Sequence, residues 1–389
     1  MNRELITGPN FSGRSAHLIA RLREEAPGAA FFIGPYAEAA LSGLSSTVAD
    51  EIDIYRARPK PAWPAFSAID FSAYAGRKPP TLSGGEQVLL ALHCFSLSRY
   101  RAIGIDTALE QLDPANRTDA LAYLAQDDAQ EFDVTLIDNR LDQAEGWSRT
   151  AMSGAADFAC DPVAATAGLT HCTAPVIAIE RLSFGYPKGR AIFEAVDLTL
   201  KPGRAYRLTG ANGAGKTTLF KLLAGVLAPS AGTISLDGAP YAPWRSGNRL
   251  FALATQNPDH QWCGATLAED AARRRAALAR HGIVAPTDTA VAALAALLGV
   301  PSLDAHLYEL PLAARKRLSW LWPLSGTLPW IMLDEPTVGQ DEATRAALAT
   351  AVARLCAHGH GVMFITHDEE FTRLIDHQSL RLEHGSIAA

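Results

Sequence analysis

Residues 210–217 are the part of this chain whose types and spacing point most directly to chemistry. They read Gly-Ala-Asn-Gly-Ala-Gly-Lys-Thr and match the pattern GxxxxGK[ST]. Glycines at these positions let the backbone turn so that its N–H groups face a phosphate. A lysine adds positive charge, and a threonine hydroxyl suits Mg²⁺. The pattern predicts a phosphate-binding loop with the contacting residues Asn212, Gly213, Gly215, Lys216, Thr217 and Thr218.

Two acids follow an apolar run that reads as a buried strand. The run is residues 330–333, and Asp334 and Glu335 come directly after it. Asp334 is placed to hold Mg²⁺ together with Thr217, and Glu335 to take a proton from an attacking water. A pair of surface acids at a strand end is the plain structural alternative.

Three further residues lie where a nucleotide would need them. Tyr186, upstream of the loop, is predicted to stack on a base, because aromatic rings stack on bases. His367, which follows the apolar run 361–365, is predicted to hydrogen-bond a terminal phosphate. Gln256 is predicted to sense Mg²⁺ and the attacking water. A core tyrosine, a lone histidine and a loop amide are the corresponding structural alternatives.

A second short motif, Leu-Ser-Gly-Gly-Glu at residues 82–86, precedes the loop in the chain. Ser83 offers a hydroxyl, and Gly84 and Gly85 admit close backbone approach. The N-terminus of a helix that starts here favours anionic oxygen, and Glu86 completes the motif. The motif therefore predicts a second phosphate-contacting segment.

The elements that position these residues alternate between strand-like and helix-like segments. In the second half a strand precedes the loop, a helix follows it, and strands end at Asp334 and before His367. Such alternation favours a mostly parallel sheet with ligands at its carboxyl edge. The first half repeats this order in shorter form, with apolar runs at residues 5–7, 31–33, 103–105 and 134–137. We expect a first domain at residues 1–160, a linker at 161–175 and a second domain at 176–389.

Composition narrows the class of protein. A chain of 389 residues with 48% apolar and 20% charged residues is long enough for two domains with real cores. The net charge of −6 gives no field that attracts nucleic acid, so no nucleic-acid partner is expected. The five cysteines show no CxxC spacing, which favours buried thiols over a metal site. No signal-peptide pattern and no run of about 18 apolar residues occur.

Taken together, these segments resemble the nucleotide-binding domain of ABC ATPases, in two copies that cover nearly the whole chain. The resemblance implies an α/β fold with two P-loop ABC domains, each a parallel-sheet core plus a helical subdomain. It implies head-to-tail packing of the two as an intramolecular pseudo-dimer, with ATP and Mg²⁺ as cofactors. It also implies catalytic roles for Lys216, Gln256, Glu335 and His367, and a Mg²⁺ contact for Gln256. Asp341 would be the D-loop aspartate and residues 82–86 the signature.

Each copy departs from the family pattern on one side only. In the first half Arg14 replaces the loop lysine, Thr107 the catalytic glutamate and Asn139 the switch histidine, while Asp106 is kept. Two further replacements in that half are Phe11 in the loop and Ile33 at the Q-loop glutamine. In the second half residues 310–314 read Leu-Pro-Leu-Ala-Ala and lack the signature serine and glycines.

Head-to-tail packing would therefore give one complete site and one degenerate site. The complete site combines the second-half residues with Ser83, Gly84 and Gly85 of the first half. The other has Arg14, Thr107 and Asn139 facing residues 310–314, and we expect it to be catalytically dead.

The resemblance also implies partners. Most such pairs power membrane transporters, so we expect a separate transmembrane subunit, a substrate-binding membrane component, and a cytoplasmic location on the inner face of the membrane. Residues 256–261, followed by the segment around Trp262, resemble the Q-loop region of energy-coupling-factor importers. The alternative is a soluble, non-transport ABC ATPase that acts in translation or remodelling.

Overall fold

The computed structural model describes residues 2–8, 14–56, 65–126, 132–141, 143, 145–153, 160–186, 191–300, 302–383 and 385–388. The chain divides into two compact units. The first consists of Met1–Ala156 together with Val338–Asp341, and the second of Asp157–Thr337 together with Glu342–Ala389. The short segment Val338–Asp341 thus groups with the first unit although it lies late in the sequence. Its Gly339 N–H donates to the Glu110 carboxylate at 3.0 Å.

The first unit alternates strands with helices. Its elements are β1 (Arg3–Thr7), α1 (Arg14–Glu25), β2 (Ala30–Ile33), η1 (Ala37–Ala40), α2 (Val48–Tyr55), η2 (Phe71–Tyr74), η3 (Pro79–Thr81), α3 (Gly84–Leu97), β3 (Ala102–Asp106), η4 (Ala108–Gln111), α4 (Pro114–Ala125), β4 (Asp133–Ile137) and β5 (Ser148–Ala151). The strands form one sheet in the order β2-β3-β4-β1-β5. Every neighbouring pair in this sheet is parallel.

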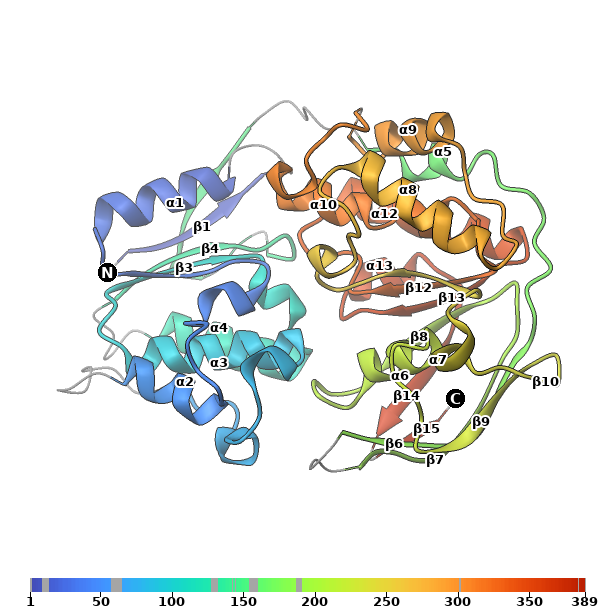
Figure 1. Cartoon of the computed structure of the whole chain (residues 1–389). Helices are drawn as coiled ribbons and strands as arrows, with labels where there is room; N and C mark the ends of the chain where they lie inside the picture. Colours follow the sequence, from blue (N-terminus) through green and yellow to red (C-terminus); the bar gives the residue numbers. More distant parts are fainter. Residues whose placement is uncertain are drawn as a thin grey trace. The chain divides into compact units, whose positions relative to one another are not determined.

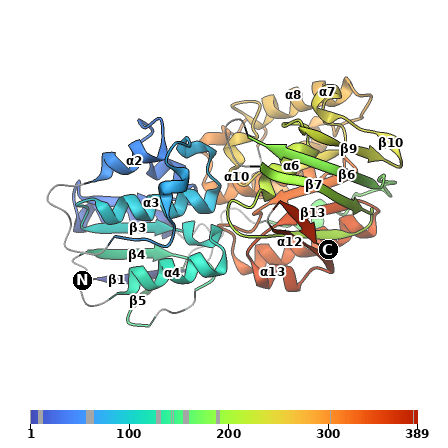
Figure 2. The ribbon, with the colours of Figure 1, turned by 90° about the horizontal axis from the view of Figure 1, so that it is seen from below.

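Helices cover both faces of this sheet, as parallel strands require. On one face α1 packs Leu18 and Leu22 against Ile6, Ala102 and Ile137. On the other face the long apolar helix α3 packs against Ile103, Ile105 and their neighbours. Figure 1 shows α1 on one side of β1, β3 and β4, and α3 and α4 on the other, and Figure 2 shows the strands of this sheet side by side. The carboxyl ends of the strands therefore share one edge.

The second unit is larger. Its elements before the apolar run 330–333 are α5 (Pro162–Ala165), β6 (Ile177–Gly185), β7 (Ala191–Leu200), β8 (Ala205–Thr209), α6 (Lys216–Leu223), β9 (Ala231–Leu236), β10 (Ala239–Pro240), α7 (Pro243–Ser246), β11 (Phe251–Ala254), η5 (Pro258–His260), α8 (Leu267–Ala279), α9 (Asp288–Leu297), η6 (Leu307–Glu309), α10 (Leu312–Leu318) and α11 (Leu321–Leu324). They are followed by β12 (Trp330–Asp334), α12 (Glu342–Ala357), β13 (Gly361–Ile365), α13 (Glu369–Arg373), β14 (His377–Glu383) and β15 (Ser386–Ala388). The short helix α5, inside the predicted linker, packs against α12 and α9.

Two sheets form the core of the second unit. One has the order β11-β12-β13-β8-β14-β15, parallel except for the final pair, and the other is the antiparallel sheet β10-β9-β6-β7. Leu219, Phe220 and Leu223 of α6 are buried in the cluster that also holds Trp330 and Met363 from the parallel sheet. The α/β architecture with a parallel-sheet core agrees with the prediction from sequence. Among the described residues, none of the helices combines the length and apolar content needed to cross a bilayer.

Candidate nucleotide site

The predicted phosphate-binding loop connects β8 to α6 in the second unit. Three of its glycines have left-handed φ values: 145° at Gly210, 76° at Gly213 and 109° at Gly215. A Cβ on Gly210 would lie 2.5 Å from the Leu382 carbonyl oxygen, and a Cβ on Gly215 would lie 2.5 Å from Ile192 Cγ2. Only glycine fits this path, because it tolerates positive φ and close packing. The curled backbone ends at the first turn of α6, the arrangement that binds anions.

The two polar side chains at the start of α6 are held close to the loop and to β12. Lys216 Nζ donates to the carbonyls of Gly210 at 2.8 Å and Ala211 at 3.1 Å. Thr217 Oγ1 donates to Asp334 Oδ2 at 2.9 Å. The structure thus brings Asp334 to the start of α6, 117 positions away from Thr217 in the sequence.

The carboxylate of Asp334 is buried, and its surroundings suit a cation. Burial raises the pKa of Asp334, while the Thr217 hydrogen bond and the charges of Lys316 and Lys216 oppose that rise. A hydroxyl next to a desolvated carboxylate is the oxygen donor set that Mg²⁺ prefers. Thr217 and Asp334 therefore fit the predicted metal position. The Asn212 side-chain nitrogen is buried with no hydrogen-bond partner among the described residues, which fits a donor awaiting a phosphate oxygen.

Glu335 stands at a backbone turn that follows β12. Its φ is 45°, and its N–H donates to the Ile365 carbonyl at 2.9 Å. The side chain is buried, and its Oε1 lies 3.7 Å from Nε2 of His367. Since adjacent strand residues point to opposite faces, this left-handed turn explains how Asp334 and Glu335 can both face one edge. The predicted base and the predicted switch histidine are thus neighbours.

Tyr186 follows β6 and is 40% exposed. Its hydroxyl is 3.3 Å from Thr218 Oγ1, and its ring meets Phe184 edge-on with centroids 5.1 Å apart. The side chain is therefore not enclosed by the core, and its hydroxyl lies beside the first turn of α6. This position is compatible with base stacking and does not fit a core tyrosine.

Gln256 is brought to the same edge through a residue that sequence reasoning missed. Lys316 Nζ donates to the carbonyls of Thr255 at 3.0 Å, Gln256 at 2.8 Å and Asp334 at 3.2 Å. Burial lowers the pKa of Lys316 to about 8, against the opposing pull of Asp334 and Glu335. The only signal in the sequence is the basic run 315–317 after the altered signature.

The first-unit motif at residues 82–86 forms the start of α3. Ser83 is the N-cap, and its Oγ accepts from the Glu86 N–H at 3.3 Å while Glu86 Oε2 accepts from the Ser83 N–H at 2.7 Å. This reciprocal pair is a capping box. Because Ser83 Oγ accepts in that pair, its own proton stays available for a further acceptor. Gly84 and Gly85 form the first turn, and Glu86 is accounted for by capping.

The corresponding place in the second unit lacks these features. Pro311 is the N-cap of α10 and makes no side-chain capping bond. Alanine and leucine side chains at residues 312–314 offer no hydroxyl or amide to a phosphate. The segment therefore begins a helix but presents no side-chain donor.

The altered residues of the first unit satisfy one another. Arg14 Nη1 donates to Asn139 Oδ1 at 2.7 Å, and Ser15 Oγ donates to Asp106 Oδ2 at 2.5 Å. Thr107 Oγ1 donates to the Asp106 carbonyl, so no carboxylate stands where a base would be needed. Ile33, at the predicted Q-loop position, ends β2 and is buried. Phe11 lies outside the described residues.

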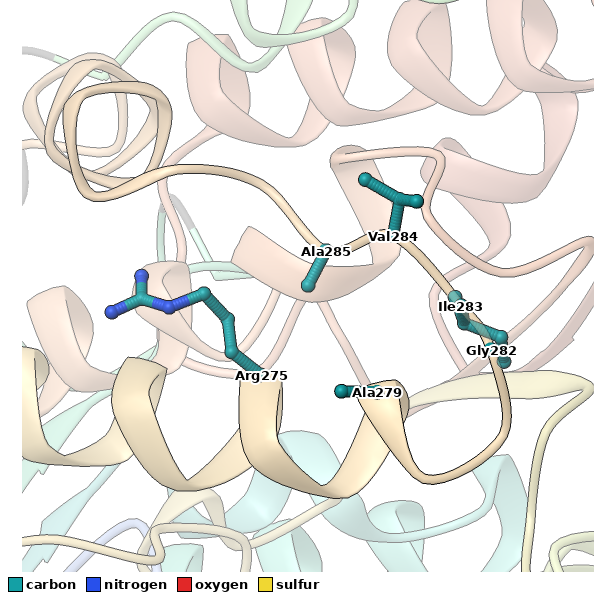
Figure 3. Close-up of a pocket in the computed structure, with 6 residues that line it drawn as sticks. All are labelled: Arg275, Ala279, Gly282, Ile283, Val284 and Ala285. Atoms are coloured by element: carbon teal, nitrogen blue, oxygen red, sulfur yellow. The ribbon is translucent and has the colours of Figure 1, made fainter.

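A surface depression of the second unit is lined by residues that belong to none of these motifs. Figure 3 shows Arg275 and Ala279 on α8 and Gly282, Ile283, Val284 and Ala285 on the segment that follows. It holds no predicted site residue, so the loop and the strand ends are the stronger candidate.

The amino-acid sequence is similar to those of known ATP-binding proteins of ABC transporters. Residues 193–338 match the ABC transporter family. A putative ABC transporter ATP-binding protein of Streptomyces coelicolor is 37% identical over 50% of this chain and 34% of its own length. A cobalt import ATP-binding protein, CbiO, of Syntrophus aciditrophicus is 33% identical over 50% of this chain and 70% of its own length. A putative ABC transporter ATP-binding protein of Methanosarcina mazei is 26% identical over 80% of this chain and 66% of its own length.

The chain belongs to the ABC transporter family of ATP-binding proteins. It spans 34% and 38% of the length of two of the Streptomyces relatives that it matches. The family match begins within β7 and ends at residue 338, three residues past Glu335.

Proposed function

We propose that this chain is the ATP-binding and ATP-hydrolysing subunit of an ABC transporter, built from two ABC-type domains of which the first is degenerate. One competent ATP site would combine the second-unit loop and acids with the first-unit signature. The observation that carries the proposal is the repetition, inside the first unit, of two features of the second: its strand order and its hydrogen bond from a hydroxyl to a buried strand-end carboxylate.

The two parallel sheets support a tandem origin. The first-unit order β2-β3-β4-β1-β5 corresponds strand for strand to β11-β12-β13-β8-β14 in the second unit. In each unit the strand before the loop is the first of the five along the chain, and it pairs with the two that come last along the chain. β1 pairs with β4 and β5, and β8 pairs with β13 and β14. The two units therefore share both the spatial order of these five strands and the order in which the chain forms them.

Local details agree at matched positions. Thr107 has φ 56° and donates to the Ile137 carbonyl, as Glu335 has φ 45° and donates to the Ile365 carbonyl. The pair Ser15–Asp106 matches the pair Thr217–Asp334.

The first loop glycines also agree. A Cβ on Gly8 would meet the Met152 carbonyl oxygen, as one on Gly210 would meet that of Leu382. Similarity to the Methanosarcina relative over 80% of the chain also reaches into both units. These correspondences support descent of both units from one nucleotide-binding fold.

The chemistry proposed for the second unit follows from its geometry. Backbone N–H groups of the loop and the Lys216 ammonium would neutralise the phosphates once Lys216 leaves the carbonyls of Gly210 and Ala211. Thr217 and Asp334 would hold Mg²⁺, which would supply charge neutralisation at the phosphates. Glu335 would orient the attacking water and accept its proton, and His367 would stabilise the terminal phosphate.

The signature supplies what the second unit lacks. Residues 310–314 give no side-chain donor, whereas Ser83 keeps a free proton at a helix N-terminus. We propose that Ser83, Gly84 and Gly85 contact the ATP that Lys216 binds. The other combination, with Arg14 bonded to Asn139 and no acid at Thr107, would not hydrolyse ATP.

The partner is proposed to be a separate transmembrane subunit, with the chain on the cytoplasmic face of the membrane. The name of the CbiO relative, a cobalt import ATP-binding protein, supports an import system. A substrate-binding membrane component and an energy-coupling-factor type of system are part of the same proposal. Co-purification of the tagged chain from membranes, with identification of the bound proteins, tests it. Recovery of ribosomes in place of membrane proteins would favour the non-transport alternative.

Nucleotide stoichiometry tests the site proposal. With Glu335→Gln, one ATP per chain should remain bound through gel filtration, and turnover should fall by at least about a hundredfold because a general base is lost. Lys216→Ala in that background should release the ATP. Two retained ATP molecules per chain would contradict the single-site proposal, and undiminished hydrolysis would remove Glu335 from its role.

A further inference from the structure

The helix α10 has lost the phosphate-contacting side chains of a signature, yet three consecutive basic residues on it reach three different parts of the second unit. Arg315 Nη1 donates to Asp259 Oδ2 at 2.6 Å, in η5. Arg317 Nη2 donates to Thr344 Oγ1 at 3.2 Å, in α12. Lys316, between them, reaches the carboxyl ends of two strands. Hydrogen bonds from its basic side chains therefore fix α10 to η5, to α12 and to the ends of two strands.

Lys316 is held more completely than its neighbours. Its residue is 1% exposed, and its ammonium donates to the carbonyls of Thr255, Gln256 and Asp334 at 3.0, 2.8 and 3.2 Å. An ammonium has three N–H donors, so all three are used. Thr255 follows β11 and Asp334 ends β12, and these two strands are neighbours in the sheet. The ammonium thus joins the ends of two parallel strands at one point.

A buried lysine is costly unless its charge and its donors are matched. Here the three carbonyls match the donors, and the carboxylates of Asp334 and Glu335 lie near enough to favour the charge. An apolar side chain of equal length would fill the volume but leave three carbonyls without this partner. The arrangement therefore depends on an amine at this position and not only on bulk.

Resting on the function proposed above, we propose that Lys316 is a positioning residue for ATP hydrolysis. It fixes the backbone of Gln256 relative to Asp334, so that the Gln256 side chain and the Asp334–Glu335 turn keep one mutual geometry. Lys316 itself need not touch the nucleotide. The degenerate signature helix would then serve as an internal brace for the catalytic edge of its own domain.

Positioning predicts a kinetic pattern that simple loss of packing does not. The loop residues around Lys216 bind the phosphates without Lys316, so ATP affinity should survive its removal. The placement of water and base should not survive, because a displacement of about 1 Å can cost up to a hundredfold in rate. The turnover number and the KM should therefore separate.

The experiment compares the full chain with the variants Lys316→Met and Lys201→Met. Lys201 is an exposed lysine directly after β7, so its substitution serves as a matched control. Steady-state ATP hydrolysis gives kcat and KM, and hydrogen exchange by mass spectrometry reports local opening. We expect Lys316→Met to lower kcat between about tenfold and a hundredfold, with KM within about threefold of wild type. We expect faster exchange confined to residues 251–261 and 330–336. Lys201→Met should match wild type in every readout.

Two results would overturn the inference. One is unchanged kcat in a folded Lys316→Met protein. The other is faster exchange across the whole second unit, with a lower kcat and a higher KM. That pattern indicates a general loss of stability. If the wild-type chain does not hydrolyse ATP, the proposed function fails separately. Exchange then decides the bracing role: opening confined to residues 251–261 and 330–336 upholds it, and uniform or absent opening overturns it.

Discussion

Thr217 Oγ1 donates a hydrogen bond of 2.9 Å to Asp334 Oδ2. The bond joins the first turn of α6 to the end of β12 and crosses 117 positions of sequence. Its carboxylate is buried, and burial raises the pKa of Asp334. A cation that enters between the hydroxyl and the carboxylate would replace this bond and relieve the desolvated charge.

Thr217→Ala should weaken the response of the protein to Mg²⁺. Removal of the hydroxyl takes away one oxygen ligand and leaves Asp334 with one partner fewer. We expect the Mg²⁺ concentration for half-maximal hydrolysis to rise at least about tenfold. Thr233→Ala, at an exposed position of β9, is the control and should leave it unchanged. An unaltered Mg²⁺ dependence in Thr217→Ala would exclude the threonine as a ligand.

Ser83→Ala should lower hydrolysis strongly although Ser83 lies in the first unit. The substitution removes both the capping acceptor and the proposed phosphate donor. Loss of an N-cap costs about 1 kcal/mol of stability, so a matched cap is the proper control. Thr47 caps α2 of the same unit through the Asp50 N–H at 3.2 Å. Thr47→Ala should cost similar stability and spare hydrolysis, and equal activity losses in the two variants would argue against a phosphate contact.

Arg14→Ala should leave turnover at saturating ATP within about twofold of wild type, because the proposed degenerate site lacks a general base. It should lower the melting temperature, because Asn139 Oδ1 loses the hydrogen bond that Arg14 donates. Differential scanning fluorimetry and a hydrolysis assay separate the two effects. Loss of hydrolysis in a folded Arg14→Ala protein would mean that the first-unit site is not idle.

The free energy of unfolding should depend on pH through the ionisation of Glu110. Burial, reinforced by the charge of Asp138, raises the pKa of Glu110 to about 7, while Arg140 and the hydrogen bonds from Asn139 and Gly339 oppose the rise. The folded state therefore binds a proton more tightly than the unfolded state. The stabilisation from this group is fully present below the unfolded pKa of about 4.5 and is lost as pH rises through about 7.

Thermal unfolding of the wild type and of Glu110→Gln at pH 5 and pH 8 tests whether Glu110 causes this pH dependence. The amide does not titrate, so the variant should show a smaller fall in melting temperature over this range than the wild type. The charges that face Glu110 include Asp138, Arg140 and Arg14, and all stay in place in the variant. Equal pH slopes in the two proteins would assign the dependence to other groups.

The candidate residues of the second-unit site could be proposed from the sequence because they lie in short contiguous motifs. The loop 210–217 needs glycines at fixed spacing, and the acids 334–335 follow an apolar run, so local sequence marks both. The α/β class followed from the alternation of strands and helices, and the structure confirms it. The sequence motif predicts a role for Gln256, but it gives no sign of the link between Gln256 and Asp334 through Lys316.

Lys316 escaped prediction for a physical reason. Its partners are backbone carbonyls, which every residue carries, so no pattern of side chains announces them. The left-handed backbone conformation shared by Thr107 and Glu335 could not be predicted either, because neither residue type favours it. The interpretation of the two units as tandem ABC domains and the composite site between them remain predictions.

The sequence by itself predicts which residues suit phosphate binding and which positions in each half lack such residues, because this depends on side-chain type and spacing. Only the tertiary structure decided how the strand ends meet, that Arg14 pairs with Asn139 and that one buried ammonium joins Gln256 to Asp334. These relations depend on the packing of segments distant in the chain, and packing distances are not encoded in any local pattern.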